Sequence, residues 1–178
     1  IKGTALAKKE FGNHIITSSV EHAAVSNSVR ALENLGFRIT VLPVDKSGQV
    51  NPEDLKEALD KETILVSIMG VNNEIGTIQP IKAISKVLED YPNVTFHVDN
   101  VQALGKDVWD EVFTDRVDLM SLSAHKFHAP RGVGILYKKE GKMIKPLIDG
   151  GGQEKALRSS TENLPAIAAT AKAMRLYL

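Results

Sequence analysis

The stretch 123–134 contains the best candidate for a nucleophile in this sequence, Lys126. Residues 117–123 before it are largely apolar and of strand length, and residues 132–137 after it are typical of a second strand. Pro130 and the glycines between them predict a turn that keeps the two strand ends close, so we expect Lys126 to face a crevice. A lysine shielded from water can attack a carbonyl carbon and form a Schiff base. The alternative is a solvated lysine in a polar turn, which is the commoner environment for this residue type.

Polar residues of diverse chemistry also follow the other predicted strands. In a largely parallel sheet the carboxyl ends of the strands lie along one edge, and ligands bind there. Because the connecting segments are otherwise undistinguished, we interpret this polar set as a candidate site. Its members are His22, Asn72, Asn73, Asp99, Gln102, Ser123 and His125, together with Lys126.

Three members of the set suit a flat, ring-shaped cofactor, although each has a structural alternative. Asp99 can keep a ring nitrogen protonated, which pyridoxal phosphate enzymes require of their acid partner, or it can cap the turn that follows it. Gln102 can donate its amide to a phenolate oxygen or lie in an exposed turn. His22 can lay its ring on a cofactor and move protons near neutral pH, or it can cap a helix.

The other members are less specific. Ser123 and His125 can donate hydrogen bonds to a phosphate, or they can be buried hydrogen-bonding groups. Asn72 and Asn73 have the chemistry of a turn. His14, His97 and His128 match no metal-ligand spacing in the sequence, so we assign them structural roles and predict no metal site.

The elements that must position these residues alternate between strand and helix. This alternation predicts an α/β fold with a mostly parallel sheet flanked by helices. The patterns predict strands over 14–18, 39–44, 64–69, 94–98, 119–123 and 133–138, and helices over 3–11, between Ser19 and Gly36, from Pro52, over 80–88 and over 164–178.

Composition narrows the classes of function. The 178 residues are 43% hydrophobic and carry 22 basic and 22 acidic residues, so the chain has a globular composition and lacks the basic footprint of a nucleic-acid-binding protein or an anionic membrane surface. No apolar run approaches membrane-spanning length and no leader is evident, which favours a soluble cytoplasmic protein. The absence of cysteine excludes a disulfide framework and a thiol nucleophile within these residues.

Five segments in order resemble the motifs of cysteine desulfurases, which belong to the class V branch of the fold-type I aminotransferases. The segments are residues 18–22 (SSVEH), 71–76 (VNNEIG), 97–102 (HVDNVQ), 123–126 (SAHK) and 158–163 (RSSTEN). The resemblance implies a three-layer large domain over residues 1–178 that binds pyridoxal 5'-phosphate, here apparently a fragment without the C-terminal small domain.

The resemblance also implies a role for each residue. Lys126 bonds covalently to the cofactor, His22 stacks on its ring, Asp99 pairs with the ring nitrogen and Gln102 contacts the phenolate oxygen. Ser123 and His125 hold the phosphate together with Thr161 from the partner subunit of a homodimer, and Asn73 holds the substrate carboxylate.

The implied reaction converts L-cysteine to L-alanine and passes the sulfur as a persulfide to an acceptor or scaffold protein, for iron–sulfur cluster assembly or thiolation. A related lyase or aminotransferase, for example one acting on selenocysteine, and a noncatalytic truncated domain are the alternatives. We expect the 178 residues alone to be inactive, because they contain no cysteine to receive the sulfur. We also expect the last predicted helix to leave Leu164, Ile167, Ala171 and Met174 as an uncovered apolar face.

Overall fold

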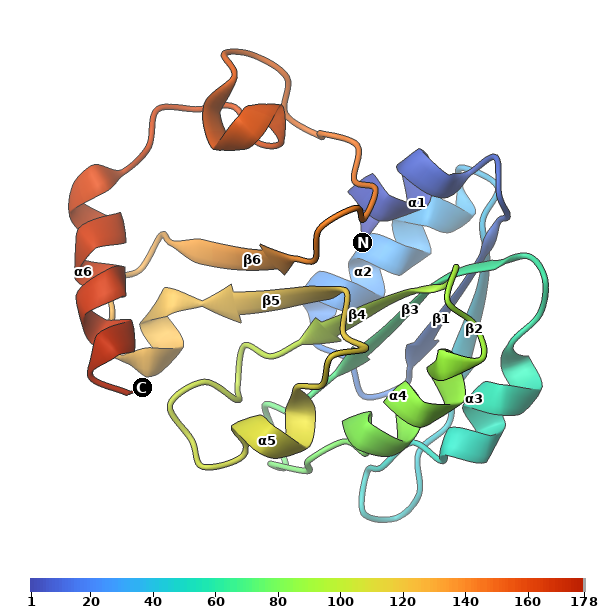
Figure 1. Cartoon of the computed structure of the whole chain (residues 1–178). Helices are drawn as coiled ribbons and strands as arrows, with labels where there is room; N and C mark the ends of the chain where they lie inside the picture. Colours follow the sequence, from blue (N-terminus) through green and yellow to red (C-terminus); the bar gives the residue numbers. More distant parts are fainter. Residues whose placement is uncertain (178) are drawn as a thin grey trace.

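The computed structural model describes residues 1–177 and has the alternating order that the sequence predicts (Figure 1). Its strands form one six-stranded sheet in the order β2-β1-β3-β4-β5-β6, in which only the β5–β6 pair is antiparallel. The elements are α1 (Lys2–Lys8), β1 (His14–Ser18), α2 (Ala23–Glu33), β2 (Arg38–Leu42), α3 (Pro52–Ala58), β3 (Thr63–Met69), α4 (Ile81–Glu89), β4 (Thr95–Asp99), α5 (Trp109–Val112), β5 (Leu119–Ser123), the 3₁₀ helix η1 (Ala124–Phe127), β6 (Gly134–Lys138), the 3₁₀ helix η2 (Gln153–Ala156) and α6 (Leu164–Arg175).

The sheet is the middle of three layers, because apolar side chains cover it on both faces. Every residue of β3 is buried, as expected for a central strand of a parallel sheet. One face packs against α1 and α2 through a small apolar cluster that includes Ala5, Val29 and Leu32. The other face packs against α3, α4 and α5 through a larger cluster centred on residues such as Phe96. The predicted α/β fold, with a mostly parallel sheet flanked by helices, is therefore confirmed.

Local sequence explains where several elements begin and end. Asn51 caps α3 by accepting a hydrogen bond from the Glu53 amide at 3.1 Å, with Pro52 at the first helical position. β2 ends at Leu42, two residues earlier than predicted, because Pro43 has no amide hydrogen to donate to a neighbouring strand. The short helix α5 was not predicted, since four residues are too few to show a helical period.

Two predicted structural histidines are confirmed as such. His97 lies in β4 with only 2% of its surface exposed, and its ring nitrogens hydrogen-bond the hydroxyls of Ser67 at 2.8 Å and Ser121 at 2.9 Å. Burial lowers the pKa of His97 to about 3, so the ring is neutral at physiological pH. His14 is likewise buried and hydrogen-bonds two threonine hydroxyls.

A buried ion network anchors the opposite, amino-terminal edge of the sheet. Asp118 is almost fully buried and contacts Arg116 Nη1 at 2.8 Å and Lys142 Nζ at 2.9 Å. It also accepts a hydrogen bond from the Phe96 amide at 2.9 Å. Lys142, in the turn after β6, is therefore placed beside a carboxylate that is distant in sequence.

The predicted apolar face of the last helix is only partly uncovered. Leu164 and Ile167 are 70% and 39% exposed, as expected, whereas Met174 packs against the main core. Figure 1 shows α6 running beside η1 at the end of β5. The predicted extension of this helix to Leu178 lies outside the described residues. Over residues 1–177 none of the helices has the length and apolar character needed to cross a bilayer.

Candidate cofactor site

The carboxyl ends of β1, β3, β4 and β5 lie along one edge of the sheet, and the register of the strands brings their last residues level. Met69 at the end of β3 pairs with Asp99 at the end of β4, and Asp99 pairs with Ser121 near the end of β5. All eight residues of the predicted set lie at the ends of these strands or in the segments that follow them. Asp99 and Ser123 end β4 and β5, His125 and Lys126 lie on η1, and the others are His22, Asn72, Asn73 and Gln102.

Asp99 is one of two buried members of this set, with 7% of its surface exposed. Its Oδ1 accepts a hydrogen bond from the Val101 amide at 3.0 Å, so the turn-capping role considered for it is present. Within residues 1–177 its second carboxylate oxygen has no hydrogen-bond partner and is available to a ligand. Burial raises the pKa of Asp99, while the Val101 amide and the His22 imidazole act in the opposite direction. The effect of His22 shows that the turn after β1 lies near Asp99.

His22 is exposed at the amino end of α2. Its Nδ1 accepts a hydrogen bond from the Ala24 amide at 3.1 Å, so His22 does cap this helix. Capping occupies one ring nitrogen and fixes the position of the imidazole beside the strand ends. The structural role is therefore compatible with a second role toward a ligand.

Gln102 is half-buried in the turn after β4. Its side-chain oxygen accepts a hydrogen bond from Lys106 Nζ at 3.2 Å, and the same amine bonds the Gln102 carbonyl oxygen at 2.7 Å. Among the described residues nothing accepts a hydrogen bond from the Gln102 amide group. Gln102 can thus donate to an acceptor at the sheet edge while Lys106 holds its oxygen.

Lys126 lies on η1, immediately after β5, and is exposed. The prediction that it faces a crevice shielded from water is wrong for residues 1–177. The reason is the 3₁₀ turn, which directs Ala124 and Phe127 into the core and leaves His125 and Lys126 on the outer side. The alternative of a buried His125 is excluded for the same reason, and Ser123 is half-buried at the end of the strand.

Asn72 and Asn73 differ in environment although they are adjacent. Asn72 is buried, and its Oδ1 accepts hydrogen bonds from the Glu74 and Ile75 amides at 2.9 Å each, so it shapes its own turn. Asn73 is exposed beside it. Of the two, Asn73 is the one whose side chain is free of the turn and open to a substrate.

Thr161 is not brought to this edge by the fold of a single chain. It is exposed in the segment between η2 and α6, which passes beyond β6 in Figure 1. The sequence resemblance assigns Thr161 to the site of a partner subunit, so its role concerns an assembly of two chains.

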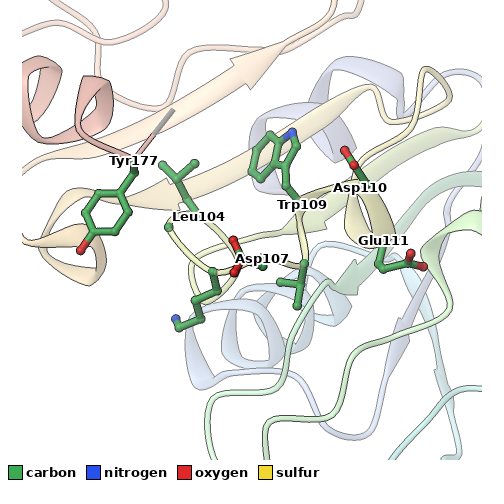
Figure 2. A pocket seen from close by; sticks show the side chains of 9 residues that line it. Leu104, Asp107, Trp109, Asp110, Glu111 and Tyr177 are labelled. Atoms are coloured by element: carbon green, nitrogen blue, oxygen red, sulfur yellow. The ribbon is translucent and has the colours of Figure 1, made fainter.

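A hollow of about 450 Å³ lies on the segment that follows β4, but it is poorly suited to an anionic cofactor. Figure 2 shows Tyr177 at one side of it and Glu111 at the other, with Asp107 and Trp109 between them. Its ionisable lining includes three carboxylates, those of Asp107, Asp110 and Glu111, which repel a phosphate group. A phosphate-bearing ligand is therefore better accommodated at the strand ends than in this hollow.

The structure adds one side chain that the sequence pattern did not single out. Glu21 precedes His22, and one of its carboxylate oxygens accepts hydrogen bonds from the Ser18 hydroxyl at 2.6 Å and the Met69 amide at 2.8 Å. The other oxygen is buried without a partner within the described chain. An acidic residue before a helix normally indicates a solvated position, and only the tertiary contact with β3 reveals its burial.

The chemistry of this edge fits pyridoxal 5'-phosphate. A buried carboxylate with an available oxygen suits a protonated ring nitrogen, an amide donor suits a phenolate oxygen, and an exposed primary amine suits an aldehyde. Hydroxyl and imidazole groups on Ser123 and His125 suit a phosphate.

The sheet is open, has helices on both faces and carries polar residues at its carboxyl edge. These features define the class of α/β proteins that bind their ligand beyond the strand ends. The chain belongs to the aminotransferase class-V family, which it matches over residues 2–177. Its fold is the fold-type I architecture of NifS-like cysteine desulfurases. The resemblance to cysteine desulfurases seen in the sequence is thereby confirmed.

Individual relatives agree. A NifS/IcsS protein homolog of Lactobacillus delbrueckii is 76% identical over 178 residues, which are 100% of this chain and 46% of that protein. Cysteine desulfurase IscS of Clostridium botulinum is 52% identical over 178 residues, 100% of this chain and 44% of that enzyme. The solved structure of a NifS-like protein is 43% identical with a TM-score of 0.92, covering 99% of this chain and 48% of that one. The structure of SspA in complex with cysteine is 38% identical with a TM-score of 0.88, covering 98% and 50%. The chain therefore spans about half the length of these relatives.

Proposed function

We propose that residues 1–178 form the cofactor-binding large domain of a pyridoxal phosphate-dependent cysteine desulfurase, which converts L-cysteine to L-alanine and passes the sulfur on. The observation that carries the proposal is the buried Asp99 carboxylate, level with β3 and β5 at a sheet edge that also bears Lys126. An acid beneath the site and an amine beside it are the two groups that this cofactor requires. Similarity to cysteine desulfurases over the whole chain supports the same assignment.

In this proposal the cofactor is held by groups of distinct chemistry. Lys126 binds it covalently, Asp99 pairs with its ring nitrogen, Gln102 donates to its phenolate oxygen and His22 stacks on its ring. The phosphate is held by Ser123 and His125, with Thr161 contributed by the partner subunit of a homodimer.

When bound, pyridoxal phosphate supplies an electron sink for the pair of electrons left on the substrate α-carbon. The chain's own residues provide the rest of this half of the reaction. Asp99, as a carboxylate, keeps the ring nitrogen protonated. Once the substrate amine has replaced Lys126 on the cofactor, the freed amine of Lys126 would take the proton from the substrate α-carbon, and Asn73 would hold the substrate carboxylate. His22 is placed to move a proton at the same edge.

L-cysteine is the proposed substrate, and the structure of SspA in complex with cysteine supports this choice because its fold matches 98% of the chain. The sulfur would pass as a persulfide to a cysteine outside these 178 residues, which contain none, and from there to an acceptor or scaffold protein. We place the protein in the cytoplasm, where iron–sulfur cluster assembly or thiolation would use the sulfur. A lyase or aminotransferase for selenocysteine or another amino acid is the alternative within the same fold.

Covalent trapping tests the proposal. The full-length protein is incubated with pyridoxal 5'-phosphate, reduced with borohydride and digested for peptide mapping. We expect the label on Lys126, and we expect Lys126→Ala to abolish it, because Lys126 directly follows β5, the strand that pairs with the one bearing Asp99. Lys56→Ala, which alters an exposed lysine on α3, is the control and should label normally. A label on a different lysine in the unaltered protein would contradict the assignment. A separate assay that compares alanine formation from cysteine and from selenocysteine distinguishes the two candidate substrates.

A further inference from the structure

Glu21 is a partly buried acid beside the cofactor site for which the proposed function has no use. Its Oε1 ties the end of β1 to the end of β3 through the Ser18 hydroxyl at 2.6 Å and the Met69 amide at 2.8 Å. These two bonds fix the turn that carries His22. Its Oε2 is buried and has no hydrogen-bond partner among residues 1–177.

The unpartnered oxygen indicates which form of the carboxyl group the fold accepts. A buried carboxylate oxygen without a donor is destabilising, whereas a protonated oxygen carries only a small dipole. The two bonds to Oε1 are kept by a neutral acid, because its carbonyl oxygen still accepts them. Geometry alone therefore favours a Glu21 that carries a proton on Oε2.

The ionisable neighbours act in the same direction. Asp99 approaches from β4, where it pairs in register with Met69, the residue that donates to Glu21. His22 belongs to the same turn as Glu21 and affects Asp99. Burial and, to a smaller extent, the charge of Asp99 raise the pKa of Glu21 to about 7, against the opposing effect of the bonds from Ser18 and Met69. Two carboxyl groups that repel each other are most stable when only one is ionised.

We propose that Glu21 is a positioning residue of the cofactor site: it holds the proton of the Glu21–Asp99 pair, so that Asp99 stays ionised toward the ring while the turn bearing His22 stays clamped to β3. The effect on the cofactor rests on the proposed function. The assignment of the proton to Glu21 does not, because it is argued from contacts within the chain. Ionisation of Glu21 would place a second negative charge beside Asp99 and load the unpartnered oxygen with charge. Both effects destabilise the folded turn, although the bonds from Ser18 and Met69 favour the carboxylate.

The first measurement needs no cofactor. A carboxyl group that binds its proton more tightly in the folded protein stabilises the fold below its ordinary pKa of 4.5, and this contribution is lost as the pH rises through about 7. We expect the unfolding equilibrium constant of the cofactor-free, full-length protein to rise by roughly 10²-fold across this window because of Glu21. Glu21→Gln keeps the shape and the accepting oxygen and should remove this component. Glu57→Gln, which alters an exposed acid on α3, should leave it unchanged.

A second variant keeps the test decisive if Glu21→Gln fails to fold. Ser18→Ala removes a hydrogen bond that favours the ionised carboxylate, so the pH window of the stability loss should move upward. An unchanged pH dependence in both Glu21→Gln and Ser18→Ala, or in whichever of them folds, would overturn the assignment of the proton to Glu21.

The second measurement is the affinity for pyridoxal 5'-phosphate between pH 6 and pH 8.5, followed by absorbance. We expect the affinity of the unaltered protein to fall several-fold more steeply above pH 7 than that of Glu21→Gln. Parallel pH profiles would overturn the positioning role even if the stability measurement locates the proton on Glu21. Failure of the unaltered protein to bind the cofactor at any pH would refute the proposed function and the positioning role, while the stability measurement would still decide the protonation of Glu21.

Discussion

The substitution Gly70→Ala is the sharpest test of how the strand ends are packed. Gly70 follows β3, and its amide donates a hydrogen bond to the Asp99 carbonyl oxygen at 2.9 Å. A Cβ atom on Gly70 would lie 1.9 Å from Oδ1 of Asn100 and 3.0 Å from Cβ of Val112. Since the backbone of Gly70 lies outside the left-handed region, alanine meets no conformational penalty and the clash is the main effect.

The clash cannot be relieved cheaply. Asn100 is fully buried, and its Nδ2 donates to the Val112 carbonyl oxygen at 3.0 Å, so its side chain cannot turn away without breaking this bond. A displacement of more than 1 Å is needed to restore an ordinary contact. Overpacking of a close-packed interior costs about 1–3 kcal/mol, and the pinned partner places Gly70→Ala near 2–3 kcal/mol. For a chain of this size the corresponding fall in Tm is roughly 5–10 °C.

Chemical denaturation of Gly70→Ala measures the effect, and two further variants interpret it. Gly134→Ala makes the same chemical change where the new Cβ would meet only Leu122 O, at 3.7 Å, and should change stability by less than about 0.5 kcal/mol. Asn100→Ala removes the clashing oxygen and loses one buried hydrogen bond, about 1 kcal/mol. The double variant with Gly70→Ala should then be more stable than the sum of the single changes by about 1–2 kcal/mol. Equal effects of Gly70→Ala and Gly134→Ala, or strict additivity in the double variant, would refute this packing.

Two further predictions concern Asp99 and Asp118. Asp99→Asn keeps the oxygen that accepts from the Val101 amide and removes a carboxyl group whose burial already disfavours its charge, so we expect Tm to change little. We expect the turnover of L-cysteine to alanine to fall about 10²-fold or more, because the ring nitrogen loses its acid partner. Ordinary turnover would mean that Asp99 is only a cap. Asp118→Ala should cost about 3–5 kcal/mol in urea denaturation, since it leaves Arg116 half-buried without its charge partner, whereas Lys82→Ala in the exposed Lys82–Glu111 pair should cost less than about 1 kcal/mol. Similar losses in these two variants would contradict the buried network.

The sequence predicts most of the fold because its strongest signals are local. Residues 14–18 and 64–69 are apolar or β-branched runs of strand length between turn signals, and both are fully buried strands in the structure. The alternation with helices then leaves few topologies, of which a parallel sheet with covered faces is the simplest. The polar residues after the strands share one edge for the same reason, so much of the candidate site followed from topology.

The features that escaped prediction depend on contacts between distant segments. Lys126 has the sequence context of a buried strand end, yet a single 3₁₀ turn exposes it. Glu21 has the context of a solvated helix start, yet the Met69 amide, 48 positions away, holds it inside. Lys142 reads as part of a basic turn and instead contacts Asp118. In each case the environment is set by a neighbour that no local pattern reveals.

The distribution of charge at the sheet edge favours one orientation for a ligand with a basic ring and an acidic phosphate. Of the two acids of the site, Asp99 is buried and Glu21 is partly buried with its Oε2 enclosed, whereas His125 and Lys126 are exposed on η1. A protonated ring nitrogen is stabilised next to Asp99, and a phosphate is repelled there and stabilised near η1. A protonated Glu21 near Asp99 changes this distribution of charge only slightly. An ionised Glu21 would bring a second full negative charge beneath the ring. The protonation of Glu21, a residue to which the sequence resemblance assigns no role, therefore determines whether the inner end of the site presents one negative charge or two.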